Sequence, residues 1–260
     1  MKHCPYFGIN GEHDAPTLLM HLKKLKTTYQ LIIWRMKKLS VKKLIEFRNK
    51  SNRAKKTFVE NIKSNKVEVN TEGGGDYWIT GLSGVCNSFK ERNLDIIDEK
   101  INELQKKISN TGRTNSKHMY QRNIAILQNY KSTDLKKLSP VGKLQFLKKS
   151  TANRLLTIKG LEIETKPSQI YLFGKKGEEK VGAIWFATKK DGYRIEEVGM
   201  FCDMLFRFLR HNYFRKYQLI PKYCVAMDLL SGNVVDYSQM EVGGLSQILS
   251  PTLDEINKLM

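Results

Sequence analysis

The sequence predicts an α+β fold, in which a basic, mainly helical region at residues 1–150 precedes a small mixed sheet with a buried helix at residues 151–260. In the first region, apolar residues recur at the three- and four-residue steps of amphipathic helices. In the second, short runs rich in Ile, Leu and aromatic residues alternate with turn residues, as in strands. Charge changes at the same boundary: residues 1–150 hold 30 Lys and Arg against 13 Asp and Glu, so +17, and residues 151–260 hold 15 against 13, so +2.

The helical region begins with an apolar stripe that continues over three heptads of residues 16–39. Ser40 is a plausible N-cap for a second helix, which continues to about residue 66. Two further stripes, at 94–108 and 117–131, are separated by a short connection and predict two antiparallel helices. A short helix is expected after Ser139 and Pro140, ending near residue 149.

The second helix carries the most basic stretch of the chain. Its first half contains seven cations against the single acid Glu46: Lys42, Lys43, Arg48, Lys50, Arg53, Lys55 and Lys56. A helix of this kind can place several cations along a phosphate backbone. The net charge of +19 attracts polyanions in general, so we expect nucleic acid as the partner. A solvated helix face is the competing interpretation.

The second region contains strands, one helix and further strands. Three or four strand-like runs lie between residues 154 and 188, and a helix buried nearly all round is expected from about Arg194 to Tyr213. Another hairpin follows, with its turn at 231–233, and a short helix ends the chain. The segment from Gly160 to Lys190 is interpreted as two strands joined by a turn.

The first strand of that segment contains the triplet Glu164-Thr165-Lys166. On an extended strand Glu162, Glu164 and Lys166 share one face. A hydrolytic metal site needs carboxylates for a hard cation such as Mg²⁺ and a cation near the reacting water. Glu164 is therefore a candidate metal ligand and catalytic residue, and Lys166 a candidate catalytic residue. A solvated strand face is the alternative.

The order hairpin, buried helix, strand over residues 155–240 resembles the core of the PD-(D/E)xK, or restriction-endonuclease-like, superfamily. The chain can be aligned with the superfamily's motif in two ways, and each alignment matches only half of the catalytic site. In the first, Glu164-Thr165-Lys166 matches the (D/E)xK triplet, but the preceding strand lacks an acid. In the second, Pro167-Ser168 matches the PD dipeptide, but residues 183–186 supply neither acid nor lysine. The resemblance implies a second acidic ligand, for which the candidates are Glu196, Glu197 and Asp228.

These observations predict a nucleic-acid-binding protein, with DNA slightly favoured over RNA, and a nuclease-like C-terminal region that is either active with Mg²⁺ or degenerate. The alternative is a non-catalytic subunit of a larger complex that binds a partner protein through its striped helices. Both roles fit a defence or mobile-element setting. No apolar run approaches the ~20 residues that span a bilayer, and no secretory signal is evident at the N-terminus. We therefore expect a cytoplasmic protein without a membrane partner.

Overall fold

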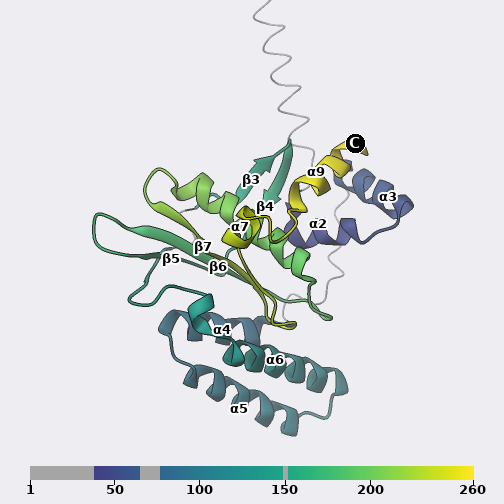
Figure 1. Ribbon diagram of the computed structural model, residues 1–260. Coiled ribbons are helices and arrows are strands. Elements are labelled where there is room, and N and C mark those ends of the chain that lie inside the picture. Colours follow the sequence, from purple (N-terminus) through teal and green to yellow (C-terminus); the bar gives the residue numbers. More distant parts are fainter. Residues whose placement is uncertain (1–37, 65–76, 149–151) are drawn as a thin grey trace, which may run out of the picture.

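A computed structural model describes residues 38–64, 77–148 and 152–260, and it confirms the α+β fold (Figure 1). Most of the first predicted stripe, up to residue 37, lies outside the described residues. Within the described residues, none of the helices combines the length and apolar character needed to cross a membrane.

A mixed sheet of five strands forms the centre of the molecule. Its strands, in spatial order, are β2 (Gln145–Phe146), β5 (Gln169–Phe173), β6 (Lys180–Ala187), β7 (Gln218–Asp228) and β8 (Val234–Asp236). The β6–β7 pair is parallel and the other three pairs are antiparallel. Helix α7 (Ile195–Tyr213) connects the two parallel strands, as a parallel pair requires. The predicted hairpin–helix–strand order is thus present as β5–β6, α7 and β7.

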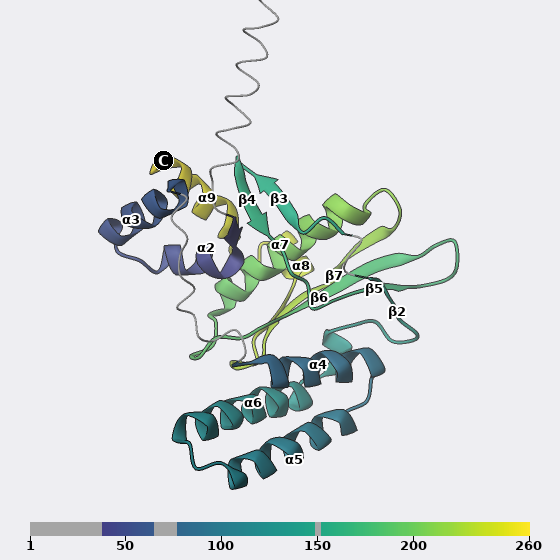
Figure 2. The same cartoon turned by 180° about the vertical axis from the view of Figure 1, so that it is seen from behind.

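Each face of this sheet is covered by helices. On one face lies α7, and on the other lie α4 (Ile79–Glu91), α5 (Asp95–Asn110) and α6 (Thr114–Ser132) (Figures 1 and 2). Ile184, Phe186 and Val225 of the sheet pack into one core with the α4–α6 helices. Ala183 and Ala226, on the opposite face, belong to the core around α7.

A second group of elements lies beyond α7. A three-stranded sheet has the order β1 (Leu39–Ser40), β4 (Leu161–Glu164) and β3 (Leu155–Ile158). Beside it in Figure 2 are α2 (Val41–Arg48), α3 (Asn52–Lys63) and α9 (Leu249–Lys258). The short helix α8 (Tyr237–Glu241) follows β8. The apolar side chains of α2 and α9 share the core of α7, so the change of charge at residue 150 does not coincide with a boundary between cores.

The structure differs from the prediction at four helices, two of which, α4 and α8, were not predicted. The second predicted helix is two helices, because α2 ends before Asn49 and Ser51 caps a new start by accepting the N–H of Ala54. The helix expected after Pro140 is absent. A 3₁₀ turn, η1 (Leu135–Lys137), comes before Pro140, and Phe146 pairs with Tyr171 as a strand.

Helix α4 was not predicted; it contains Gly81 and Gly84, and glycine disfavours helices. Gly81 is required by packing: a Cβ there would lie 2.5 Å from the Cδ1 atom of Ile126. The Gly81 N–H also donates to the Asn123 side chain at 2.8 Å. The same close approach that holds α4 against α6 therefore explains why the sequence signal for a helix is weak here.

Candidate nucleic-acid interface and metal site

Glu164 and Lys166 do not lie on the central sheet. Glu164 is the last residue of β4, where it pairs with Ser40 of β1 and Leu155 of β3. The hairpin predicted within 160–190 exists as β5 and β6. The placement of Glu164 and Lys166 on its first strand is wrong, since β4 and β5 belong to different sheets. Pro167, which has no N–H to donate, lies in the link between them. The hairpin partner of β4 is β3, and that of β5 is β6.

The two residues pair with each other. Lys166 Nζ lies 2.8 Å from Glu164 Oε2, with side chains 63% and 37% exposed. An ion pair this exposed is worth roughly 0 to 1 kcal/mol. Among the residues that the structure describes, no three His, Cys, Asp or Glu side chains come close enough to hold a metal ion together. The residues around Glu164 therefore do not fit a Mg²⁺ site.

Glu197, one candidate for the second ligand, is buried in the first turn of α7. Asn49 donates to its Oε1 atom at 2.9 Å, and the Arg194 backbone N–H donates to Oε2 at 3.0 Å. Burial alone would raise the pKa of Glu197. The hydrogen bond from Asn49, the Arg194 N–H and the charges of Lys189 and Arg194 outweigh burial, so the pKa is lowered. Glu197 thus caps α7 and joins it to the α2–α3 junction.

The carboxylate of Asp228, another candidate, also accepts hydrogen bonds from the backbone. It is fully buried at the end of β7 and accepts the N–H groups of Tyr193, Leu230 and Ser231 at 2.7 to 3.2 Å. The third candidate, Glu196, is exposed on α7. None of the three lies in a group of acids that could bind a metal within the described part of the chain.

The second alignment, of Pro167-Ser168 with the PD dipeptide, concerns the β5–β6 hairpin of the central sheet. Ser168 precedes β5, its N–H bonds to the carbonyl of Ile184, and its hydroxyl accepts the N–H of Phe186 at 2.8 Å. The position matched to the acid of the PD dipeptide is therefore a serine that serves the sheet. Opposite it, β6 carries apolar residues from Val181 to Ala187. The hairpin has the expected order of elements without the carboxylates.

The predicted phosphate-binding cations fall into two groups. Four are exposed, and three are half-buried. The exposed ones are Lys42, Lys50, Arg53 and Lys56. Of the others, Arg48 donates to the Thr252 hydroxyl at 3.1 Å, and Lys55 pairs with Glu255 at 2.7 Å, so both hold α9. Lys43 is the third half-buried cation.

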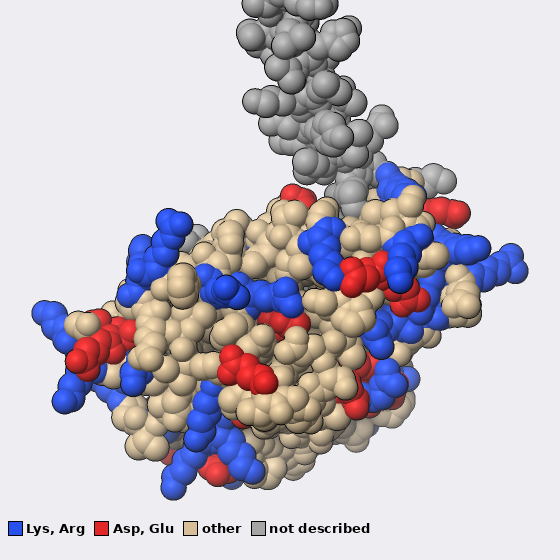
Figure 3. Space-filling view, turned by 45° about the horizontal axis from the view of Figure 1, so that its top comes forward, with Lys and Arg blue, Asp and Glu red and all other residues tan. Residues whose placement is uncertain are grey.

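The exposed cations adjoin the start of α7. Asn49, between α2 and α3, accepts a hydrogen bond from the Arg194 side chain at 3.0 Å. The Arg194 side chain is itself 68% exposed. Residues 38–64 contain nine Lys and Arg against two Glu. Lys and Arg gather at the right-hand end of the face in Figure 3, where α3 lies in Figure 1. We call Lys42, Lys50, Arg53, Lys56 and Arg194 the α2–α3 cationic surface.

Asn49 is the residue that sequence reasoning missed. It carries no charge, and its partners Arg194 and Glu197 are about 150 residues away in the chain. No local pattern marks such a contact. Comparisons with protein-family models, with curated proteins and with solved structures found no match for this chain.

Proposed function

We propose that the chain binds nucleic acid, with DNA favoured, through the α2–α3 cationic surface. The observation that carries the proposal is that four of the seven candidate cations remain exposed on α2, α3 and the link between them. Two neighbouring acids, Glu197 and Glu255, are already engaged in bonds within the protein. Exposed cations spaced along helices can neutralise successive phosphates.

Replacing Lys42, Lys50, Arg53 and Lys56 by Gln tests the proposal. Because these side chains are exposed and the changes spare Arg48 and Lys55, the fold should be kept. Binding to a DNA duplex should weaken. The slope of log affinity against log salt should fall by about 3 to 4, since each phosphate that the protein neutralises contributes roughly 0.9 to that slope. Fluorescence anisotropy over a range of salt concentrations measures both quantities.

The matched control removes four exposed lysines elsewhere: Lys106, Lys143, Lys175 and Lys176 to Gln. It changes net charge by the same amount, so it corrects for the general field of the protein. If the control weakens binding as much as the α2–α3 variant, the charge of the whole molecule, and not this surface, accounts for the affinity. The same titration with an RNA duplex shows whether the protein binds DNA or RNA more tightly.

We further propose that the nuclease-like region does not cut at Glu164. The support is the exposed Glu164–Lys166 pair and the lack, among the described residues, of a group of three side chains that could hold a metal ion there. Purified protein should leave DNA intact in Mg²⁺ or Mn²⁺, and Glu164→Gln should change stability by no more than a few tenths of a kcal/mol. Chelator-sensitive cleavage that disappears in Glu164→Gln would contradict this.

The alternative is a subunit that binds a partner protein through the apolar stripes of its helices. One of these stripes, that of α5, is not available for a partner. In α5, Ile97 and Leu104 are fully buried within the core that α4 and α6 share with the central sheet. That stripe is therefore used inside the protein. A nucleic-acid partner remains the better-supported proposal.

A further inference from the structure

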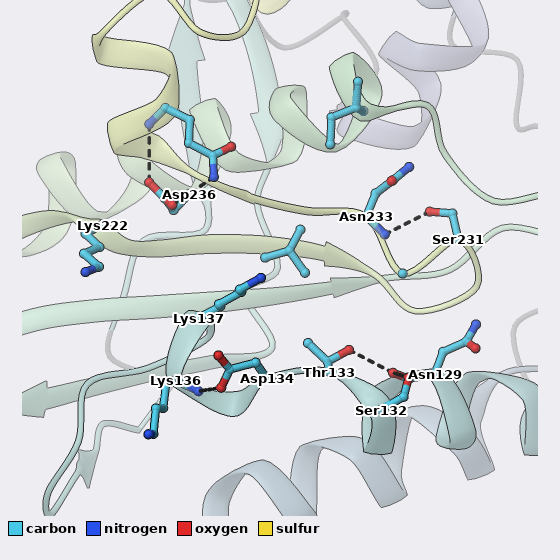
Figure 4. A pocket seen from close by; sticks show the side chains of 14 residues that line it. Asn129, Ser132, Thr133, Asp134, Lys136, Lys137, Lys222, Ser231, Asn233 and Asp236 are labelled. Atoms are coloured by element: carbon cyan, nitrogen blue, oxygen red, sulfur yellow. Dashed lines mark hydrogen bonds between the residues drawn. The ribbon is translucent and has the colours of Figure 1, made fainter.

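A polar cleft lies beside β8, the edge strand of the central sheet (Figure 4). Its floor and walls come from the end of α6, from η1, from β7, β8 and the turn between them, and from Ile195 of α7 and Gln239 of α8. The cavity volume is about 850 Å³, within the range of roughly 300 to 1,000 Å³ that small-molecule sites occupy. No residue of α2 or α3 contributes to its lining.

The walls of the cleft are fixed by hydrogen bonds. The Asn129 amide of α6 donates to the carbonyls of Leu229 and Leu230, at 3.1 and 2.7 Å, and so ties the helix to the β7–β8 turn. The Asp228 carboxylate accepts the Ser231 N–H of that turn at 3.2 Å, and Asn233 donates to the Tyr193 carbonyl at 3.0 Å. A cavity held in this way exists before any ligand binds, which lowers the cost of binding.

Three lysines and two aspartates line the cleft, so its formal net charge is +1. Its two acids are engaged as caps: Asp134 accepts the Lys136 N–H, and Asp236 accepts the N–H and side-chain amide of Gln239. Lys137 extends from η1 into the gap and Lys222 approaches from β7, whereas Lys136 points away (Figure 4). Lys137 and Lys222 are exposed and form none of the ion pairs found within the described residues.

We propose that this cleft binds a phosphate-bearing ligand of about the size of a nucleotide, with Lys137 and Lys222 contacting the phosphate. The lysines supply the charged donors. The Ser132 and Thr133 hydroxyls donate to the Asn129 carbonyl and keep oxygen lone pairs that can accept from a sugar or base. The ligand is either a free nucleotide or the phosphorylated end of a nucleic-acid strand. No residue of the α2–α3 cationic surface lines the cleft, although Ile195 of the lining follows Arg194 in the chain. The proposal does not depend on that surface.

Calorimetric titration of the full chain tests the proposal with four probes: adenosine monophosphate, adenosine, and a short single-stranded oligonucleotide with and without a 5′ phosphate. The expected result is binding of the monophosphate or of the phosphorylated oligonucleotide, with at least tenfold weaker binding of the matching probe that lacks phosphate. Preference for the monophosphate identifies a free nucleotide as ligand. Preference for the phosphorylated oligonucleotide identifies a strand end.

The double variant Lys137→Gln, Lys222→Gln should weaken phosphate-dependent binding at least tenfold. The control Lys175→Gln, Lys176→Gln removes two exposed charges from the β5–β6 turn and should change it less than twofold. The variant of Lys42, Lys50, Arg53 and Lys56 should also keep it, so failure of the two proposals can be told apart. Binding that ignores the phosphate, binding unchanged in the Lys137 and Lys222 variant, or no binding of any probe would overturn the proposal.

Discussion

At the scale of single residues, the Glu197 carboxylate shows how a buried charge is held in this fold. It is 2% exposed, and burial without partners would favour its neutral form. Asn49, Arg194 and, at 3.9 Å, Lys189 supply the opposing interactions. The same contacts attach the α2–α3 junction to the first turn of α7. The position of the proposed nucleic-acid surface therefore depends on an uncharged residue that does not belong to it.

We expect Asn49→Ala to lower the free energy of unfolding by about 1.5 to 3 kcal/mol at neutral pH, the usual effect of losing a hydrogen bond to a charged group. The folded pKa of Glu197 is lowered, so its stabilising contribution is present above the unfolded pKa and is lost as pH falls through the folded pKa. The cost of Asn49→Ala should therefore shrink in acid, well below the ordinary glutamate pKa of about 4.3.

Urea unfolding of the parent and the Asn49→Ala protein at neutral and acidic pH measures this difference. Asn61→Ala, at an exposed position on α3, is the control and should show little change at either pH. A loss of stability of the same size at both pH values would mean that Asn49 acts through packing or the end of α2, and not through the carboxylate.

At the scale of elements, regular periodicity was enough to predict several helices. The stripe at 94–108 corresponds to α5, that at 117–131 to α6, and the buried helix to α7. Each has a run of apolar residues long enough to exceed the length of a strand. The break at Asn49 could also have been found, since Ser51 is a good N-cap within an otherwise helical stretch.

Strand pairing could not be predicted in the same way. In β4, buried and half-buried residues alternate, and β5 is largely buried. Such a pattern identifies a strand, but it does not show which other strand pairs with it. β4 pairs with β1, about 120 residues earlier, while β5 pairs with β2 and β6. The spacing of Glu164 and Lys166 in the triplet, two residues apart, was enough to predict that they lie close together. Whether a third group joined them depended on long-range contacts that the triplet does not encode.

At the scale of the whole molecule, charge and packing divide the chain differently. The excess of positive charge lies in residues 1–150, but each of the two cores contains residues from both sides of residue 150. The five-stranded sheet is covered on one face by α4–α6 and on the other by α7, which packs in turn against α2 and α9. The compositional boundary therefore describes where cations are placed and not where one folding unit ends.

This arrangement predicts that residues 152–260 produced alone will not fold cooperatively. Without α4–α6 the sheet would expose Ile184, Phe186, Val225 and Met227, each at most 4% exposed in the whole protein. At roughly 1.5 to 3 kcal/mol per side chain, the loss is about 6 to 12 kcal/mol, comparable with the entire stability of a typical domain. The piece should bind a hydrophobic dye and lack a sharp melting transition by circular dichroism, and co-expression with residues 1–151 should reverse both results. A cooperative transition in the isolated piece, without dye binding, would show instead that the sheet and α7 fold independently and that the helices of the first region are an added layer.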